Sequence, residues 1–84
     1  MTGREIQAFV DAEPFQPFRI HMASGRTFDV RHPEMIRIGR TSVTVFAFSQ
    51  DDERFYERVE MLGLLLIESI SVLDTSVASS GSSE

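Results

Sequence analysis

Two histidines and one carboxylate lie near each other in the first half of the chain: His21, Asp29 and His32. Two imidazoles and a carboxylate are a ligand set that suits Zn²⁺ or Fe²⁺ in proteins. Such a site requires both imidazoles on one side of the backbone. The strand pairing predicted below sets Phe18 rather than His21 opposite His32, which keeps the imidazoles apart. We therefore predict no metal site, and instead a cross-strand pair of His21 with Asp29.

His32, Pro33 and Glu34 form a second group with chemical potential, because histidine and glutamate both transfer protons in enzymes. No nucleophile accompanies them. Ser24 and Ser42 are expected in turns, without the glycine-framed elbow that exposes a catalytic serine. Pro33 disfavours helical geometry at the residue before it, so we interpret the three residues as a structural corner that redirects the chain. The sequence thus predicts no catalytic site and no cofactor.

Basic side chains are frequent between residues 19 and 37, and four of them are candidates for one patch: Arg19, His21, Arg31 and Arg37. A guanidinium binds phosphate or carboxylate through two parallel hydrogen bonds. The predicted pairing sets Arg19 opposite Arg31, which is mildly unfavourable and suggests an anionic partner. The patch therefore predicts an anion-facing or RNA-facing surface, although the net charge of −5 does not favour nucleic acid as a partner.

The elements that position these residues begin with a β-hairpin. Apolar residues alternate with polar ones in two consecutive segments, which is typical of strands with one buried face. Residues directly opposite each other in an antiparallel pair share a face. An odd loop, of three residues (24–26) or five, sets Met22 opposite Phe28 and Ile20 opposite Val30. A two-residue loop would set apolar residues against polar ones, so we predict the odd loop.

A short helix precedes the hairpin. Thr2 and Glu5 have the spacing of a capping box, in which each side chain accepts a hydrogen bond from the backbone of the other residue. The apolar residues that follow recur at helical spacing, and Pro14 ends the pattern. The sequence predicts a helix over residues 3–12, packed against the sheet because a helix this short is marginal alone.

Further extended segments follow the hairpin at residues 35–38, 43–48, 55–60 and 67–73, while the interval 61–66 fits either a helical turn or a strand. Pro33 breaks or bends the second strand. A helix followed by about five short strands predicts a mainly β (α+β) fold, with a strongly bent antiparallel sheet that closes as a small Sm-like or SH3-like barrel. The alternative is an open antiparallel sheet with one helix on a face.

The segment 43–48 is apolar on both faces, so it is either central to a barrel or packed against a partner subunit. Exposed apolar strips usually mark interfaces. We predict a homo-oligomer joined through strand edges. Its interface is drawn from residues 43–48 and from 55–60 or 67–73, with Val43, Val45, Phe46, Phe48 and Tyr56 as the candidate residues. The predicted function is a non-catalytic binding or assembly module, with room for a different protein partner. The alternative function is an RNA-binding regulator that uses the arginine-rich face.

The length of 84 residues suits one small domain, which we place at residues 1–74, followed by a disordered serine-rich tail at 75–84. The absence of cysteine excludes disulfides, thiolate metal sites and cysteine nucleophiles. The N-terminus lacks the basic and apolar segments of a signal peptide. The longest apolar run, residues 64–67, is too short to span a membrane. We therefore expect a cytoplasmic protein without a membrane partner.

The run Pro-Phe-x-Pro-Phe-x-Ile-His-x-x-x-Gly-Arg-x-Phe-x-Val-x-His-Pro-Glu at residues 14–34 resembles a group of short, uncharacterised bacterial proteins. That resemblance covers the general layout to about Leu73 and implies no particular activity. In layout, a helix followed by five strands with a Gly-Arg hairpin also resembles the Sm-like fold. This second resemblance implies a sharply bent second strand and rings in which a fourth strand pairs with a neighbour's fifth.

Overall fold

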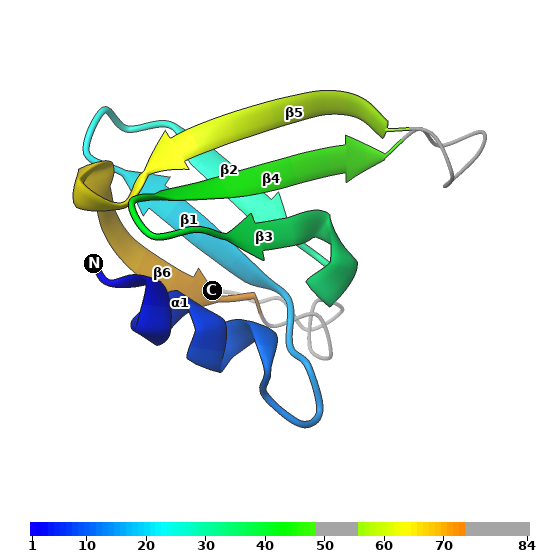
Figure 1. The fold of residues 1–84 in the computed structure, drawn as a ribbon. Coiled ribbons are helices and arrows are strands. Elements are labelled where there is room, and N and C mark those ends of the chain that lie inside the picture. Colours follow the sequence, from blue (N-terminus) through cyan, green and yellow to red (C-terminus); the bar gives the residue numbers. More distant parts are fainter. Residues whose placement is uncertain (49–55, 74–84) are drawn as a thin grey trace, which may run out of the picture.

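The computed structural model describes residues 1–48 and 56–73, without the side chains of residues 47, 48, 56 and 57; the predicted tail at 75–84 lies outside these residues. Within them, six strands form two three-stranded antiparallel sheets, accompanied by one α-helix (Figure 1). Sheet A has the strand order β2-β1-β6, and sheet B has the order β3-β4-β5. The elements in chain order are α1 (Gly3–Val10), β1 (Phe18–Met22), β2 (Thr27–Val30), the 3-10 helix η1 (Pro33–Met35), β3 (Ile36–Ile38), β4 (Ser42–Phe48), β5 (Tyr56–Gly63), the 3-10 helix η2 (Leu64–Leu66) and β6 (Ile67–Val72).

Helix α1 starts as the sequence predicts. The Thr2 hydroxyl accepts a hydrogen bond from the N–H of Glu5, and the Glu5 carboxylate accepts one from the N–H of Thr2, which confirms the capping box. The helix ends at Val10, with Asp11 as its cap, two residues before the predicted limit. Ile6 is fully buried and joins the helix to the core. No helix in the described part of the chain has the length and apolar character that a membrane crossing needs.

The hairpin of β1 and β2 has an odd loop, as predicted, but the predicted register is wrong by two residues. Ile20 lies opposite Phe28 instead of Val30. The loop is residues 23–25, one position earlier than expected, because Gly25 adopts the left-handed φ of +97°. A type I turn followed by a left-handed residue closes a three-residue hairpin loop, and glycine takes that conformation without steric cost. A shift of two residues keeps the same side chains on the buried face.

The shifted register changes every pair on the outer face of the hairpin. Arg19 lies opposite Asp29, and His21 lies opposite Thr27. The predicted pairs of Arg19 with Arg31 and of His21 with Asp29 are therefore wrong. The like-charge contact that the sequence suggested does not exist, because the turn chemistry moves an aspartate into the position expected for an arginine.

The predicted five-stranded closed barrel is not supported. Among the residues described, no ladder joins sheet A to sheet B, whereas closure would need one. Pro33 has no N–H to donate to a ladder, and it starts the 3-10 turn η1 between β2 and β3. Of the two predicted alternatives, a broken or a bent second strand, the structure shows the break: β2 and β3 are separate strands in different sheets. The open antiparallel arrangement with one helix, the stated alternative, fits this topology.

The undecided interval at residues 61–66 contains both kinds of structure. Strand β5 continues to Gly63, and the three following leucines form the 3-10 helix η2. The Leu64 N–H donates to the Thr41 C=O at 3.0 Å, so the first residue of η2 still bonds to the segment that precedes β4. This short turn then leads the chain from sheet B back to sheet A, where β6 pairs with β1.

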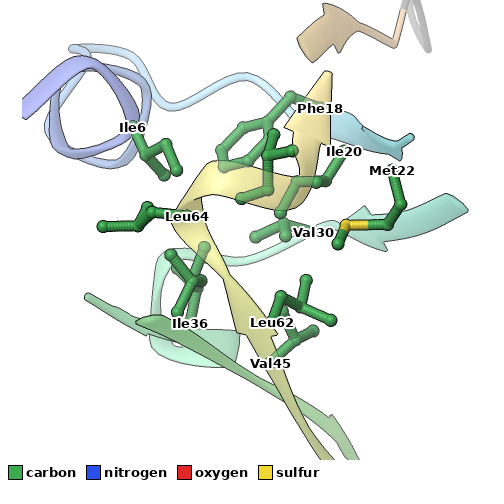
Figure 2. Packing of buried hydrophobic residues seen from close by; sticks show 11 residues of the cluster. Ile6, Phe18, Ile20, Met22, Val30, Ile36, Val45, Leu62 and Leu64 are labelled. Carbon is green, nitrogen blue, oxygen red and sulfur yellow. The ribbon is translucent and has the colours of Figure 1, made fainter. Parts of the chain in front are cut away.

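The two sheets and α1 share one hydrophobic core (Figure 2). Phe18 lies at its centre with no exposed surface, and its ring contacts the rings of Phe9 and Phe15 at centroid distances of 5.5 and 6.0 Å. Tilted aromatic pairs at this spacing stabilise a core beyond the area that they bury. The buried residues are Ile6, Phe18, Ile20, Met22, Val30, Ile36, Val43, Val45, Leu62, Leu64 and Ile67.

Candidate interaction surfaces

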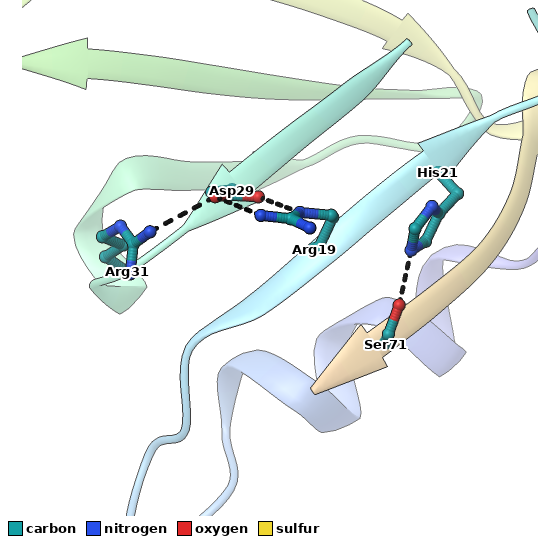
Figure 3. A network of polar contacts seen from close by, with 5 residues as sticks. All are labelled: Arg19, His21, Asp29, Arg31 and Ser71. Atoms are coloured by element: carbon teal, nitrogen blue, oxygen red, sulfur yellow. Dashed lines mark hydrogen bonds and ion pairs between the residues drawn. The ribbon is translucent and has the colours of Figure 1, made fainter. Parts of the chain in front are cut away.

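Asp29 holds two arginines on the outer face of sheet A, the face directed away from the core (Figure 3). Arg19 donates from Nε to Oδ1 at 2.7 Å and from Nη2 to Oδ2 at 3.1 Å. Arg31 Nη2 lies 3.3 Å from Oδ2 of the same carboxylate. A two-point guanidinium contact is stronger and more directional than a single bond. The arginine-rich face is therefore partly neutralised within the chain.

The ion pair with Arg19 changes the titration of both groups. The hydrogen bonds from Arg19 lower the pKa of Asp29, and the positive charges of Arg19, Arg31 and His21 add to this effect while burial opposes it. The same hydrogen bonds raise the pKa of Arg19. Asp29 therefore stays ionised into more acidic conditions than an ordinary aspartate, which keeps the pair intact at neutral pH.

His21 interacts with β6 and not with Asp29. Its Nε2 atom and the Ser71 hydroxyl share a hydrogen bond across the β1–β6 pair (Figure 3). The candidate ligand set of His21, Asp29 and His32 is not brought together. Among the residues described, no group of three or more histidine, aspartate or glutamate side chains is placed to hold a metal ion.

The segment His32, Pro33 and Glu34 is the exposed link between the two sheets. His32 has extended backbone angles, with φ at −143° and ψ at 145°, and Pro33 occupies the start of η1. The Met35 N–H donates to the His32 C=O at 3.0 Å, which closes the turn. This geometry carries the chain from β2 in sheet A to β3 in sheet B.

Arg37 lies apart from the other members of the predicted basic patch. It belongs to β3 in sheet B, where it faces Thr44 of β4, and its Nη1 donates to the Ile36 C=O at 2.9 Å. Arg19, His21 and Arg31 all belong to sheet A or its end. The four residues predicted as one anion-facing patch are therefore divided between two sheets.

The residues predicted for a subunit interface have different surroundings. Val43 and Val45 are core residues, with 0% and 6% of their surface exposed, so they offer a partner almost no surface. Phe46 is half-buried and lies opposite Val59. Phe48 and Tyr56 are paired in the β4–β5 ladder, but their side chains lie outside the described residues.

Two apolar residues are exposed on β5: Val59, inside the predicted interface segment 55–60, and Met61, just beyond it. Val59 and Met61 have 46% and 71% of their surface accessible. They lie opposite Phe46 and Thr44 on β4, on the outer face of sheet B. The sequence shows the period-two alternation of a strand here, which places the valine and the methionine on the same face. It could not show whether that face is exposed, because this depends on which side of sheet B the core occupies.

Strand β5 is also an edge. In the strand order of sheet B it pairs with β4 alone among the described strands, and Figure 1 shows it along the margin of the molecule away from α1. It has eight residues, whereas the other edge strands, β2, β3 and β6, have four, three and six. A long edge with exposed apolar side chains is a template for pairing with another chain.

Charged side chains lie on the opposite face of the same edge. Glu60 contacts two arginines at 3.5 Å each, Arg26, which directly follows the hairpin loop, and Arg58 from its own strand. The side chains of Arg58 and Glu60 remain 65% and 32% exposed. These ion pairs are long and solvated, so they contribute little to the stability of the monomer and are available to a partner.

Comparisons of the chain with protein-family models, with curated proteins and with solved structures found no match, so the surfaces described above are interpreted from their own chemistry.

Proposed function

We propose that the protein is a non-catalytic assembly module that associates with a second copy of itself through the free edge of β5. One observation carries the proposal: an eight-residue edge strand presents Val59 and Met61 to solvent on its outer face. Natural edge strands are usually kept short or charged to prevent such pairing. Strand β5 is long, and although it carries Arg58 and Glu60, the described residues of its outer face are apolar, which suits a partner strand.

The small size of the domain supports association with a second copy. A chain of 84 residues buries a modest share of its surface, and oligomerisation is a common supplement to a small core. Pairing at a sheet edge requires main-chain hydrogen bonds and a few side-chain contacts, both of which β5 supplies. Self-association therefore uses surface that the described part of the monomer leaves uncovered.

The alternative proposal, RNA binding by the arginine-rich face, has less support. Arg19 and Arg31 both contact Asp29, so their guanidinium groups have fewer donors for phosphate. Arg37 lies on a different sheet. RNA affinity from phosphate contacts grows with the number of cations that one surface presents together, and here that number is small.

The test is the native mass in solution, by light scattering on a sizing column, for the wild type and for Val59→Glu. We expect the wild type to exceed the monomer mass and Val59→Glu to elute as a folded monomer. Val72→Glu is the matched control, because Val72 is 49% exposed on β6, an edge of the other sheet. It should leave the mass unchanged.

A wild-type chain that stays monomeric at every concentration would overturn the proposal. If the Val59 and Val72 variants lowered the native mass equally, the interface would lie elsewhere than at the edge of β5. Nucleic acid that co-elutes with the protein, and that separates as salt is raised, would favour the RNA-binding alternative instead.

A further inference from the structure

We infer that two copies pair strand β5 with strand β5 in antiparallel orientation about a two-fold axis at Val59, so that Arg58 of each copy faces Glu60 of the other. The inference rests on the proposed function and adds the register, the symmetry and the residues that select them. Three properties of the edge lead to it: the direction of its free backbone groups, the order of its charges and the exposure of its apolar side chains.

The backbone of β5 determines which residues can bond to a partner strand. In an antiparallel ladder, alternate residues direct both N–H and C=O to the same neighbour. Leu64 bonds to Thr41 at 3.0 Å, which assigns the even-numbered residues of β5 to β4. The bond from the Gly39 N–H to the Ser42 C=O, at 2.7 Å, assigns the even-numbered residues of β4 to β3 and agrees with this phase. The backbone groups of Val59, Met61 and Gly63 therefore point to the free edge.

Two-fold registers centred on any residue from 58 to 62 satisfy this backbone requirement, and the charges distinguish them. Centring on Arg58 sets two arginines against each other, and centring on Leu62 pairs no opposite charges. Centring on Val59 sets Arg58 opposite Glu60 of the second copy, and symmetry repeats that pair. Centring on Glu60 sets two carboxylates against each other and Arg58 against Leu62. Centring on Met61 sets Glu60 against the buried side chain of Leu62. Opposite charges placed directly across an antiparallel pair stabilise it, and like charges destabilise it, so the Val59 register is favoured.

The same register brings exposed apolar side chains together. Val59 lies against Val59 of the second copy on the outer face, beside Phe46 in each copy. The two three-stranded sheets become one six-stranded sheet, with the outer faces of both copies continuous. Because each copy offers the same patch to the other, the contact closes on itself and produces a dimer without further growth.

The decisive test uses two single variants, Arg58→Glu and Glu60→Arg, measured alone and mixed. Alone, each sets like charges opposite each other at both symmetry-related positions, and we expect the dimer Kd to weaken at least about tenfold. Mixed in equal amounts, they form a heterodimer in which both pairs are again of opposite charge. We expect the mixture to recover the wild-type dimer mass.

Recovery of the dimer mass on mixing distinguishes the proposed contact between two copies from an effect of the substitutions within one copy. The contacts of Glu60 with Arg26 and Arg58 lie inside each chain, and mixing cannot restore them. Denaturant unfolding of each variant checks that both are folded. A dimeric wild type whose Arg58→Glu variant dimerises normally would overturn the register while leaving the proposed function intact, whereas a monomeric wild type would overturn both. A ring of more than two copies would also contradict the two-fold contact.

A cysteine cross-link provides a second test that does not depend on the charge variants folding. The natural sequence has no cysteine, so Val59→Cys introduces one thiol. Opposite residues of a hydrogen-bonded antiparallel pair have Cα atoms about 5.5 Å apart, within the range that a disulfide bridges. We expect mild oxidation to produce a covalent dimer of Val59→Cys.

Met61→Cys is the matched control for the cross-link. In the Val59 register the two copies of residue 61 are offset by four residues along the strands, about 14 Å, so they should remain unlinked. Cross-linking of Met61→Cys but not of Val59→Cys would overturn the inference and place the axis at Met61.

Discussion

The outer faces of the two sheets of this protein carry different kinds of side chain. On sheet A, polar side chains find partners within the chain: Arg19 and Arg31 on Asp29, and His21 on Ser71. On sheet B, the outer face of the edge strand carries Val59 and Met61, both exposed. Both sheets cover the same core with their inner faces. The difference between them therefore lies in what remains for a second molecule.

That difference shows why a basic patch in a sequence is a weaker indication of function than an exposed apolar edge. A charged side chain can be neutralised by a neighbour a few residues away, as Asp29 neutralises Arg19. An apolar side chain at an edge strand has no such local remedy, because only burial removes it from water. Sheet A also exposes one apolar edge residue, Val72 on β6, but the longer edge of sheet B exposes two neighbouring ones on its outer face, Val59 and Met61, which a partner strand would cover.

The largest effect on the free energy of unfolding should come from the hydrophobic core that the two sheets share. Phe18→Ala removes a fully buried ring from the centre of the core and should lower the free energy of unfolding by about 3–5 kcal/mol. Leu65→Ala, at a residue 93% exposed, should change it by less than about 0.5 kcal/mol. Denaturant unfolding measures both. Similar losses for the two variants would contradict a common core centred on Phe18.

Gly25→Ala should be the next largest effect, because it acts on the turn that sets the register of sheet A. The φ of +97° is strained for any residue with a Cβ atom, and a left-handed conformation costs about 1–2 kcal/mol for alanine. No atom lies within 4 Å of the added Cβ, so the loss reflects backbone conformation alone. The measurement is denaturant unfolding, with Ala23→Gly in the same loop as the comparison. An unaffected Gly25→Ala variant would argue against the left-handed turn.

Asp29→Asn tests whether the outer face of sheet A depends on its internal ion pairs. The variant keeps the size of the side chain and removes its charge, and should lower the free energy of unfolding by about 1 kcal/mol. Glu68→Gln, at an exposed carboxylate on β6, should have a smaller effect. Raising the salt concentration should reduce the difference between wild type and Asp29→Asn, because ions screen the pair. A salt-independent difference would indicate packing rather than charge.

The pH dependence of the free energy of unfolding tests the ion pairs of Asp29 in the wild-type protein itself. The pKa of Asp29 is lowered in the folded state, so its contribution is fully present above the ordinary aspartate pKa of about 4. The contribution is lost as the pH falls through the lower pKa of the folded state. The stability of the wild type should therefore approach that of Asp29→Asn in acid. A constant difference between them down to the lowest pH would contradict the ion pair.

The smallest effect on the free energy of unfolding of the monomer should come from a substitution on the outer face of sheet B. Met61→Ser changes a residue that is 71% exposed, so the free energy of unfolding measured at high dilution should change by less than about 0.5 kcal/mol. The same variant should weaken self-association in the native-mass experiment. A large loss of monomer stability would mean that Met61 belongs to the core, and the contrast between the two sheets would then disappear.

Local patterns in the sequence determine a substantial part of this fold. The capping box at Thr2 and Glu5, the alternation along β1 and the strong strand signal of β4 depend on neighbours a few residues apart. The odd parity of the hairpin loop follows from the same alternation, since only same-face pairing buries the apolar side chains. Such features are predictable because their physical causes are local, in backbone sterics and in period-two burial.

Tertiary structure alone decided the division into two sheets and which strands lie side by side, whereas local turn chemistry, which the alternation pattern does not reveal, set the register of the hairpin. The left-handed turn at Gly25 moved the hairpin by two residues and brought Asp29 opposite Arg19. His21 and Ser71 meet although they are 50 residues apart in the sequence. Period-two alternation indicates which residues share a face of a strand but not which strand lies beside it. Val59 and Met61 are exposed because the core lies on the other face of β5. The candidate interface therefore follows from long-range packing, which selects one pairing among several that the local pattern allows equally.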